Sequence, residues 1–166
     1  MSKYVLVTGY SGFVGSHLLH KLKPLANVNF LGRSVPYNCH KHLKASISPD
    51  EDYSSILTDV SVVIHIAARA HIMNDNATNP LDEFRYVNTQ GTLNLARQAV
   101  SAGAKRFIFV SSVKVNGEST HNDQAFTNTD KACPDDPYGI SKADAESELK
   151  QLSDETGLEV VIIRPP

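Results

Sequence analysis

The sequence has no hydrophobic run that approaches the ~20 residues of a membrane-spanning helix. Its two cysteines, Cys39 and Cys133, lie far apart and show neither metal-binding nor redox spacing. The 16 basic and 18 acidic residues nearly balance, and the basic residues form no cluster. We therefore expect no metal, no membrane partner and no nucleic-acid partner. Isolated thiols suit a reducing compartment, and the first residues lead into a strand instead of a signal peptide, so we expect a cytoplasmic protein.

The chain of 166 residues is 41% hydrophobic and 20% charged, which fits one ordinary domain with a sizeable core. Predicted strands and helices alternate along it. The strands are expected at 4–8, 28–31, 43–47, 62–67, 106–110 and 159–163, and the helices at 13–23, 53–57, 79–102 and 137–156. This alternation predicts an α/β fold, a Rossmann-like doubly wound parallel sheet of about six strands with helices on both faces.

A glycine-rich turn follows the first predicted strand. Gly9, Gly12 and Gly15 allow close approach of the backbone to a ligand, and a helix that begins there offers free N–H groups to a diphosphate. The alternative is a turn that binds nothing, but its place between a strand and a helix favours a dinucleotide. The residues expected to bind NAD(P) here and at the end of the 62–67 strand are Gly9, Ser11, Gly12, Phe13, Val14, Gly15, Ala67 and Ala68.

The end of the second predicted strand is where a Rossmann fold inspects the adenosine ribose. The sequence there reads Gly32-Arg33-Ser34. An acidic residue would bind the 2′-hydroxyl of NAD, whereas Arg33 and Ser34 could hold the 2′-phosphate of NADP. The residues thus lean to NADP, although a surface arginine after a strand is also common.

Tyr138 and Lys142 lie four residues apart at the start of a predicted helix and therefore share one face. Asp135 and Asp136 offer capping oxygens, and Pro137 suits the first helical position. A tyrosine titrates near pH ~10, so its use as a base at neutral pH costs about 4 kcal/mol. One ammonium ~4 Å away supplies an interaction of that size at an effective dielectric of ~20. The alternative is an ordinary helix pair without function.

Three other polar residues lie at positions where a functional role is possible. Ser112 follows the strand predicted at 106–110, at the sheet edge where sites form. Asn88 lies inside a long predicted helix, where an asparagine is usually solvated, yet it stands next to the apolar stripe and near Gly91. His65, in an apolar strand, is expected to be packed and hydrogen-bonded, not catalytic. Residues 118–136 lack periodicity and predict one long loop.

These motifs occur in a fixed order, which is Gly9-x-x-Gly12-x-x-Gly15, then 65–68, 88–92, 110–117 and 137–142. In that order they resemble the extended short-chain dehydrogenase/reductases, in particular the nucleotide-sugar epimerase/dehydratase group. Residues 69–75 also look like a segment of bacterial epimerase-like proteins from surface-polysaccharide pathways. The resemblance covers nearly the whole chain.

The resemblance implies hydride transfer at C4 of a nucleotide-sugar, most simply a UDP-sugar, through a 4-keto intermediate, as in a UDP-glucose 4-epimerase. Tyr138 and Lys142 would also contact the NAD(P). Tyr138 would exchange a proton with the sugar hydroxyl, Ser112 would hydrogen-bond the same oxygen, and Asn88 would hold the backbone or water that relays the proton. These residues, with Lys142, form the expected catalytic set.

Departures from the family pattern keep alternatives open. Dehydratases carry an Asp-Glu pair where this chain has Val113 and Lys114, so sugar 4,6-dehydration is not expected. Asn116 stands where epimerases often have tyrosine, and Gly32-Arg33 replaces the usual acidic residue. An NADPH-dependent reductase of nucleotide-4-keto-sugars is therefore a competitor, and a non-catalytic dinucleotide sensor is a third reading.

The length of the chain also departs from the family pattern. Family members continue beyond Arg164-Pro165 into a carboxyl-terminal region that binds the nucleotide-sugar. Residues 1–166 are therefore expected to form an NAD(P)-binding domain without that region, as a fragment with little turnover. Similar proteins pair two molecules through helices like those predicted around 80–102 and 137–156, so the resemblance implies a homodimer. From the sequence alone, the same faces could be internal core.

Overall fold

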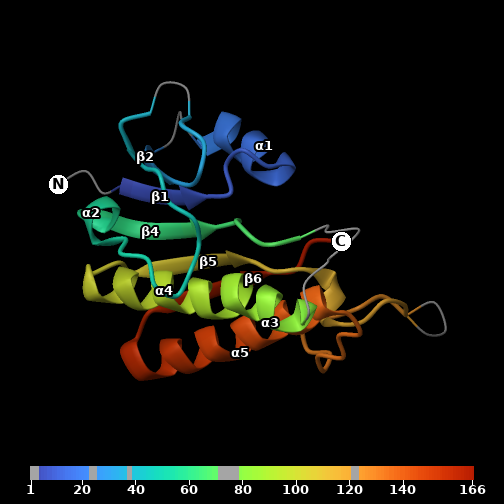
Figure 1. The fold of residues 1–166 in the computed structure, drawn as a ribbon. Coiled ribbons are helices and arrows are strands. Elements are labelled where there is room, and N and C mark those ends of the chain that lie inside the picture. Colours follow the sequence, from blue (N-terminus) through green and yellow to red (C-terminus); the bar gives the residue numbers. More distant parts are fainter. Residues whose placement is uncertain (1–3, 23–25, 37–38, 71–78, 121–123) are drawn as a thin grey trace.

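The fold is seen in a computed structural model that describes residues 4–22, 26–36, 39–70, 79–120 and 124–166 (Figure 1). Its centre is one parallel sheet in the order β3-β2-β1-β4-β5-β6. The strands are β1 (Tyr4–Thr8), β2 (Asn27–Leu31), β3 (Lys41–Leu43), β4 (Val60–His65), β5 (Arg106–Val110) and β6 (Glu159–Ile163). The Rossmann-like doubly wound parallel sheet of about six strands, predicted from the alternation of elements, is confirmed.

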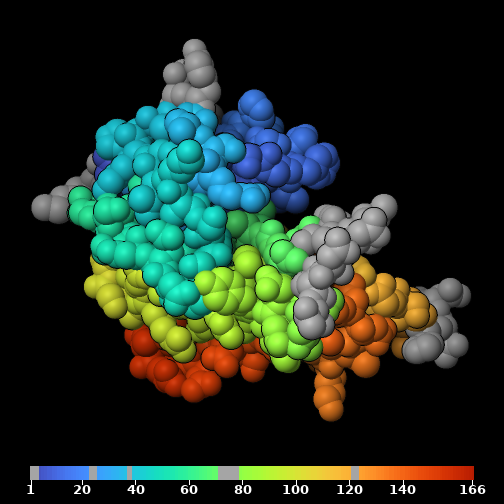
Figure 2. Space-filling view, in the orientation of Figure 1, coloured from blue at the N-terminus to red at the C-terminus, as the bar shows by residue number. Residues whose placement is uncertain are grey.

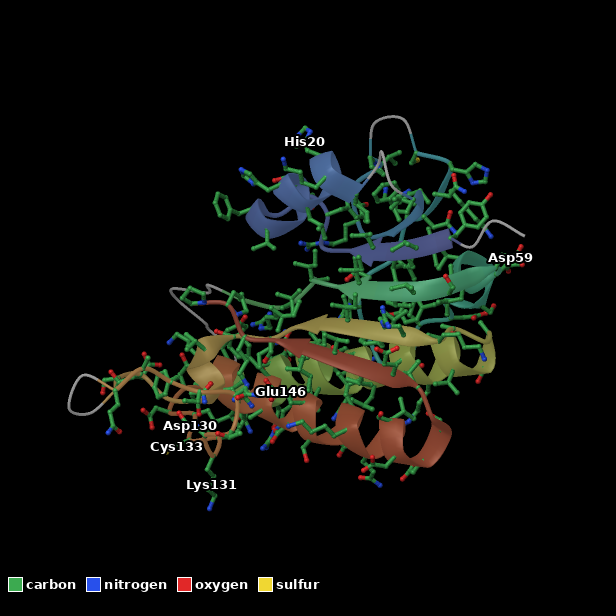
Figure 3. The ribbon with its side chains drawn as sticks, turned by 180° about the vertical axis from the view of Figure 1, so that it is seen from behind. His20, Asp59, Asp130, Lys131, Cys133 and Glu146 are labelled. Atoms are coloured by element: carbon green, nitrogen blue, oxygen red, sulfur yellow. The ribbon has the colours of Figure 1, made fainter. Side chains whose placement is uncertain are left out.

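Helices cover both faces of the sheet. Leu6 and Val7, neighbours in β1, point to opposite faces and belong to two separate apolar clusters. Helix α1 (Phe13–Leu22) packs on the Val7 side, whereas α2 (Ser54–Leu57), α4 (Thr92–Ser101) and α5 (Pro137–Thr156) pack on the Leu6 side. Figures 1 and 3 show α4 and α5 on one side of β4 to β6. The described part of the chain places no helix on the other side of β5 and β6.

The long helix predicted at 79–102 is continuous but not regular. It consists of α3 (Pro80–Phe84), a π-helical segment from Arg85 to Gly91, and α4. The π segment was not predicted, because hydrophobic spacing does not reveal a local change from i→i+4 to i→i+5 bonding. Gly103 follows at φ +85°, where a glycine ends a helix without strain.

Most element bounds agree with the prediction. The strands at 4–8, 106–110 and 159–163 are found at those residues, and α5 ends at Gly157 in the left-handed conformation. The third strand was placed wrongly. β3 covers Lys41–Leu43, whereas 43–47 was expected, because it is an edge strand paired only with β2 and leaves the sheet after Leu43. Residues 124–136 and 118–120 of the predicted loop contain no helix or strand.

Because all six strands are parallel, their carboxyl ends lie along one edge of the sheet. Ser112 and the predicted cofactor-binding residues other than Tyr138 and Lys142 follow β1, β2, β4 and β5 at that edge. A 3-10 turn, η2 (Val113–Val115), comes directly after β5 and Ser112. Of the polysaccharide-type segment 69–75, residues 71–75 lie outside the described residues.

Candidate active site

A cleft of about 640 Å³ opens at the carboxyl ends of β1, β2 and β4. In Figure 2 the surface is hollowed between the blue atoms of α1 and the green atoms that follow β4. Nine of the residues predicted to bind the cofactor line it, namely Gly9, Ser11, Gly12, Phe13, Val14, Gly15, Arg33, Ala67 and Ala68. Ser34, Tyr138 and Lys142 were predicted as well but are not among its lining residues.

The glycine turn is packed too tightly for side chains at two of its three positions. A Cβ on Gly15 would lie 2.2 Å from the Gly9 carbonyl oxygen, and one on Gly9 would lie 2.5 Å from the Ala67 nitrogen. Gly9 also has φ +69°, which favours glycine. Gly12 differs, since a Cβ there would meet only the Gly9 oxygen, at 3.4 Å. The close contacts of Gly9 and Gly15 fix the shape of the turn. Because Gly12 has no side chain, the free amides at the start of α1 stay accessible from the cleft, which suits the diphosphate of a dinucleotide.

His65 joins the strands behind this cleft. Its Nδ1 lies 2.7 Å from the Thr8 hydroxyl and its Nε2 lies 2.9 Å from that of Thr92. The Thr8 hydroxyl in turn accepts from the amides of Ile66 and Ala67, at 3.2 and 3.1 Å. Burial, reinforced by the charge of Lys142, lowers the pKa of His65 to about 3, so the imidazole is neutral. The expectation of a packed, hydrogen-bonded histidine is confirmed.

The segment after β2 is shaped by Tyr10, a residue that the sequence did not single out. Its hydroxyl donates to the Ser34 carbonyl and lies 3.1 Å from His42 Nε2. A Cβ on Gly32 would lie 3.0 Å from the Tyr10 ring, so the ring and the strand end are in close contact. Arg33 is exposed at the cleft. Ser46 and Ile47, which follow β3, also line the cleft, and no sequence motif marked them.

Helix α5 begins as the sequence indicated. Asp136 is its N-cap and accepts from the Gly139 amide at 2.6 Å, and Pro137 takes the first position. Ala145, Leu149 and Leu152 are buried below Tyr138 and Lys142, as their spacing predicted. Lys142 is 1% exposed. Its ammonium donates to the Val110 carbonyl at 2.7 Å and lies 3.9 Å above the Phe109 ring, which fixes α5 against the end of β5.

The electrostatics of this pair differ from the expectation. Burial lowers the pKa of Lys142 to about 7, although Glu146 opposes the change. The pKa of Tyr138 is raised, first by burial and then by the charge of Asp136, while Lys114 lowers it in part. In the protein without cofactor, Lys142 is not among the groups that lower the pKa of Tyr138. The physical reason is that a buried ammonium loses part of its charge, and this one is bound to Val110.

Asn88 is 1% exposed, so the usual reading of a solvated mid-helix asparagine is excluded. Its Oδ1 accepts from the Arg69 amide at 2.8 Å, and its Nδ2 donates to the Arg69 carbonyl and to Ser141 Oγ, both at 3.0 Å. Ser141 Oγ itself donates to the Tyr138 carbonyl at 2.8 Å. The π-helical segment thus presents Asn88 inward, where it connects the chain after β4 to the first turn of α5.

Ser112 is the N-cap of η2, and its Oγ accepts from the Lys114 amide at 3.2 Å. The structure thus attaches each predicted catalytic residue to the same helix. Tyr138 and Lys142 lie on α5, Asn88 bonds to Ser141 of α5, and the Ser112 turn packs on the start of α5.

The sequence pattern of the NAD dependent epimerase/dehydratase family matches residues 5–166, which is nearly the whole chain. The chain belongs to this family. The chain is 43% identical over 170 residues to a UDP-glucose 4-epimerase of Vibrio cholerae. That match covers 99% of this chain and 52% of the relative. The chain thus spans about half the length of this family member.

Two solved structures of the family's fold are similar to the chain. A short-chain dehydrogenase/reductase superfamily protein from Agrobacterium tumefaciens, with bound NAD, superposes with a TM-score of 0.83 at 28% identity. It is matched over 97% of this chain and 48% of its own. A UDP-N-acetylglucosamine 4-epimerase from Methanobrevibacter ruminantium, in complex with UDP-N-acetylmuramic acid, gives 0.82 at 29% identity, over 98% of this chain and 54% of its own.

A buried ion pair on the same helix as Tyr138 and Lys142 was missed by sequence reasoning. Glu146, labelled in Figure 3, is 2% exposed. Its carboxylate accepts hydrogen bonds from Nε and Nη2 of Arg164, at 2.9 and 2.5 Å. Ser111 Oγ donates to the same carboxylate at 2.6 Å. The i,i+4 spacing of Lys142 and Glu146 was the available signal. The pair holds the ends of β5 and β6 against α5.

Two further kinds of feature are absent from the described residues. None of the helices there combines the length and apolar character needed to span a bilayer. Within the same residues, no three His, Cys, Asp or Glu side chains gather in a way that could hold a metal ion.

Proposed function

We propose that this chain is the NAD(P)-binding part of a nucleotide-sugar 4-epimerase that acts on a UDP-sugar, of the UDP-glucose 4-epimerase type. The observation that carries the proposal is that α5 holds Tyr138 and Lys142 and is hydrogen-bonded to both Asn88 and the end of β5. The groups for proton transfer are thereby held in fixed relative positions beside a cleft suited to a dinucleotide. The 43% identity to a UDP-glucose 4-epimerase supports the same reading.

In this proposal each polar residue has a separate task. Tyr138 exchanges the proton of the sugar 4-hydroxyl, and Ser112 donates a hydrogen bond to the same oxygen. Asn88 fixes the Arg69 backbone, as it does here through two hydrogen bonds, and so keeps a relay path in place. Lys142 contacts the cofactor and shares a helical face with Tyr138. Bound NAD(P) would supply the acceptor and donor for the C4 hydride, and Gly9, Ser11 to Gly15, Ala67 and Ala68 would hold it.

The cofactor preference follows from the end of β2. Gly32 offers no carboxylate for a ribose 2′-hydroxyl, and Arg33 is an exposed cation at the cleft, so we propose NADP over NAD. Arg33→Ala is expected to weaken NADP binding about tenfold and to leave NAD binding nearly unchanged, as measured by calorimetric titration of both cofactors. Lys131→Ala, a basic residue on the 124–136 segment, is the matched control. Equal NADP affinity in wild type and Arg33→Ala would refute the role of Arg33.

The same feature favours a second candidate function. An enzyme that consumes NADPH to reduce a nucleotide-4-keto-sugar would benefit from a 2′-phosphate site, whereas an epimerase returns its hydride to the sugar. Lys114 fits either enzyme but not a dehydratase, because its ammonium is paired with Glu118 and Asp136 at 2.7 and 2.6 Å. It cannot serve as the acid of an elimination while it holds both carboxylates.

In this proposal, different parts of the protein bind the cofactor and the sugar. Residues 1–166 bind the cofactor, and a further region supplies most of the sugar-binding wall, so this chain alone should turn over little substrate. Measurable epimerase or reductase turnover by the 166 residues would contradict it.

We also propose a cytoplasmic homodimer that uses outer faces of α3, α4 and α5. Light scattering that gives a monomer at high concentration would argue against the dimer.

The decisive experiment uses the chain extended beyond Pro166 and assays it in two ways. One assay follows UDP-glucose epimerisation with NADP and, separately, with NAD, and the other follows NADPH oxidation with a nucleotide-4-keto-sugar. Tyr138→Phe is expected to lose at least a hundredfold in kcat in whichever assay is positive. Tyr86→Phe is the control, because that exposed phenol donates its hydrogen bond to Asp50. Cofactor binding without turnover in either assay would favour the sensor reading.

A further inference from the structure

Lys114 contacts both of the segments that carry the proposed proton-transfer groups. Its backbone amide donates to Ser112 Oγ at 3.2 Å. Its ammonium, at the other end of the side chain, donates to Asp136 Oδ2 at 2.6 Å and to Glu118 Oε1 at 2.7 Å. The proposed mechanism gives this residue no task.

Asp136 is the matching contact on α5. Its second oxygen, Oδ1, accepts from the Gly139 amide at 2.6 Å, so one carboxylate both caps the helix and binds Lys114. The two backbones also touch, since a Cβ on Gly139 would lie 2.9 Å from the Lys114 carbonyl oxygen. Tyr138 stands between Asp136 and Gly139 in the chain. The Ser112 turn and the Tyr138 turn are therefore joined by the Lys114–Asp136 ion pair and by this close backbone approach.

We propose that Lys114 is a positioning residue that holds the Ser112 turn against the start of α5 and sets the charge balance beside the Tyr138 phenol. The inference rests on the proposed function only in assigning Ser112 and Tyr138 to one reaction. The contact itself does not depend on which reaction that is.

The groups around Tyr138 support this assignment. From the N-cap of α5, the charge of Asp136 raises the pKa of Tyr138, after the larger effect of burial, and from η2 the charge of Lys114 lowers it. Helix α3 contributes the Phe84 ring, 6.2 Å from the Tyr138 ring, and Arg69 lies 5.4 Å from that same Phe84 ring. Lys142, on α5 itself, is bound to Val110. Lys114 and Asp136 are thus an opposed pair of charges acting on one phenol.

This opposition predicts effects of opposite sign for the two partners. Lys114→Met leaves the Asp136 carboxylate uncompensated and disfavours the phenolate. Asp136→Asn removes that charge yet keeps a good N-cap, and so favours the phenolate. In the double variant the two effects should largely cancel, because the interacting charges have been removed together. Lys114→Arg retains the charge and should behave like wild type.

The test measures ionisation of Tyr138 directly, in the chain as it is. Tyrosine labelled with ¹³C at Cζ reports phenol and phenolate, and Tyr138→Phe assigns the signal. At about pH 10.5, with folding verified by circular dichroism, Lys114→Met should lower the phenolate-to-phenol ratio of Tyr138 about twofold to fourfold. Asp136→Asn should raise it by a similar factor. Glu118→Gln, which loses a partner of the same ammonium, and Lys131→Met should leave the ratio within about 30% of wild type.

Three outcomes would overturn the proposal. One is an unchanged ratio in a folded Lys114→Met chain, and another is a change of the same sign in Lys114→Met and Asp136→Asn. The third is a Lys114→Arg chain that behaves like Lys114→Met. None of these measurements requires turnover, so failure of the epimerase proposal would leave the result for Lys114 intact, and the reverse also holds.

Discussion

Replacing Asn88 with alanine tests whether the π-helical segment is held by its side chain. The substitution removes three hydrogen bonds, two to the Arg69 backbone and one to Ser141, at 2.8, 3.0 and 3.0 Å. At a net ~1 kcal/mol each, and with buried backbone groups losing their partner, the expected loss is about 3 kcal/mol. That is a large part of the ~5–15 kcal/mol that stabilises a typical domain. For a chain of this size it corresponds to a fall in Tm of about 6–12 °C.

Urea unfolding followed by circular dichroism measures the free energy of unfolding of the Asn88→Ala chain. Thr89→Val is the matched control. It lies in the same π-helical segment and loses one hydrogen bond, from its hydroxyl to the Ser141 carbonyl at 2.9 Å, so about 1 kcal/mol is expected. A loss below ~1 kcal/mol for Asn88→Ala, or equal losses for both variants, would refute the view that Asn88 ties α5 to the chain after β4.

Two further predictions concern the cleft and the buried lysine. Gly12→Ala should fold normally, because its new Cβ has only a 3.4 Å contact, but it should bind NAD(P) at least tenfold more weakly. Gly15→Ala should lower Tm as well, because its new Cβ would lie 2.2 Å from the Gly9 oxygen. Thermal melts with and without cofactor separate the two, and a Gly12→Ala chain with normal affinity would argue against the cleft as the diphosphate site. The pKa of Lys142 is about 7 in the folded protein, against 10.5 ordinarily. Between these two pH values the unfolded chain binds more protons than the folded chain, so stability rises with pH. Below pH ~7 the folded protein carries the full free-energy cost of burying the charged ammonium. Lys142→Met should therefore be more stable than wild type by on the order of 3 kcal/mol at pH ~6, with the difference shrinking toward pH ~10, and a pH-independent difference in urea unfolding would exclude this explanation.

Local sequence signals were sufficient where local forces decide the structure. The strands at 106–110 and 159–163 are short runs of β-branched and aromatic residues, and α5 has a capping aspartate, an initial proline and a terminal glycine. Each of these signals acts within a few residues, so the predicted and observed bounds agree. The glycine spacing likewise located the cleft, because only the absence of a Cβ allows Gly9 and Gly15 to pack as they do.

What could not be predicted depends on distant partners. β3 ends where its pairing with β2 ends, which no property of 41–47 specifies. The Lys142 ammonium donates to the Val110 carbonyl, 32 positions away, while burial and the charge of Asp136 raise the pKa of Tyr138. The burial of Glu146 requires Arg164 from the last strand end. Spacing along one helix shows which residues share a face, but not which of them the sheet will engage.

The irregular turn around Asn88 has a consequence for how this helix can vary. A π segment holds one more residue than the α-helical turn it replaces, so it is equivalent to a single inserted residue in a regular helix. Removing one residue between Arg85 and Asn88 should therefore restore an unbroken α-helix whose two halves keep their relative orientation, with Phe84 and the Leu93–Ala96 face still in the core. The cost of the lost residue would fall on the hydrogen bonds of Asn88, which the π segment presents inward.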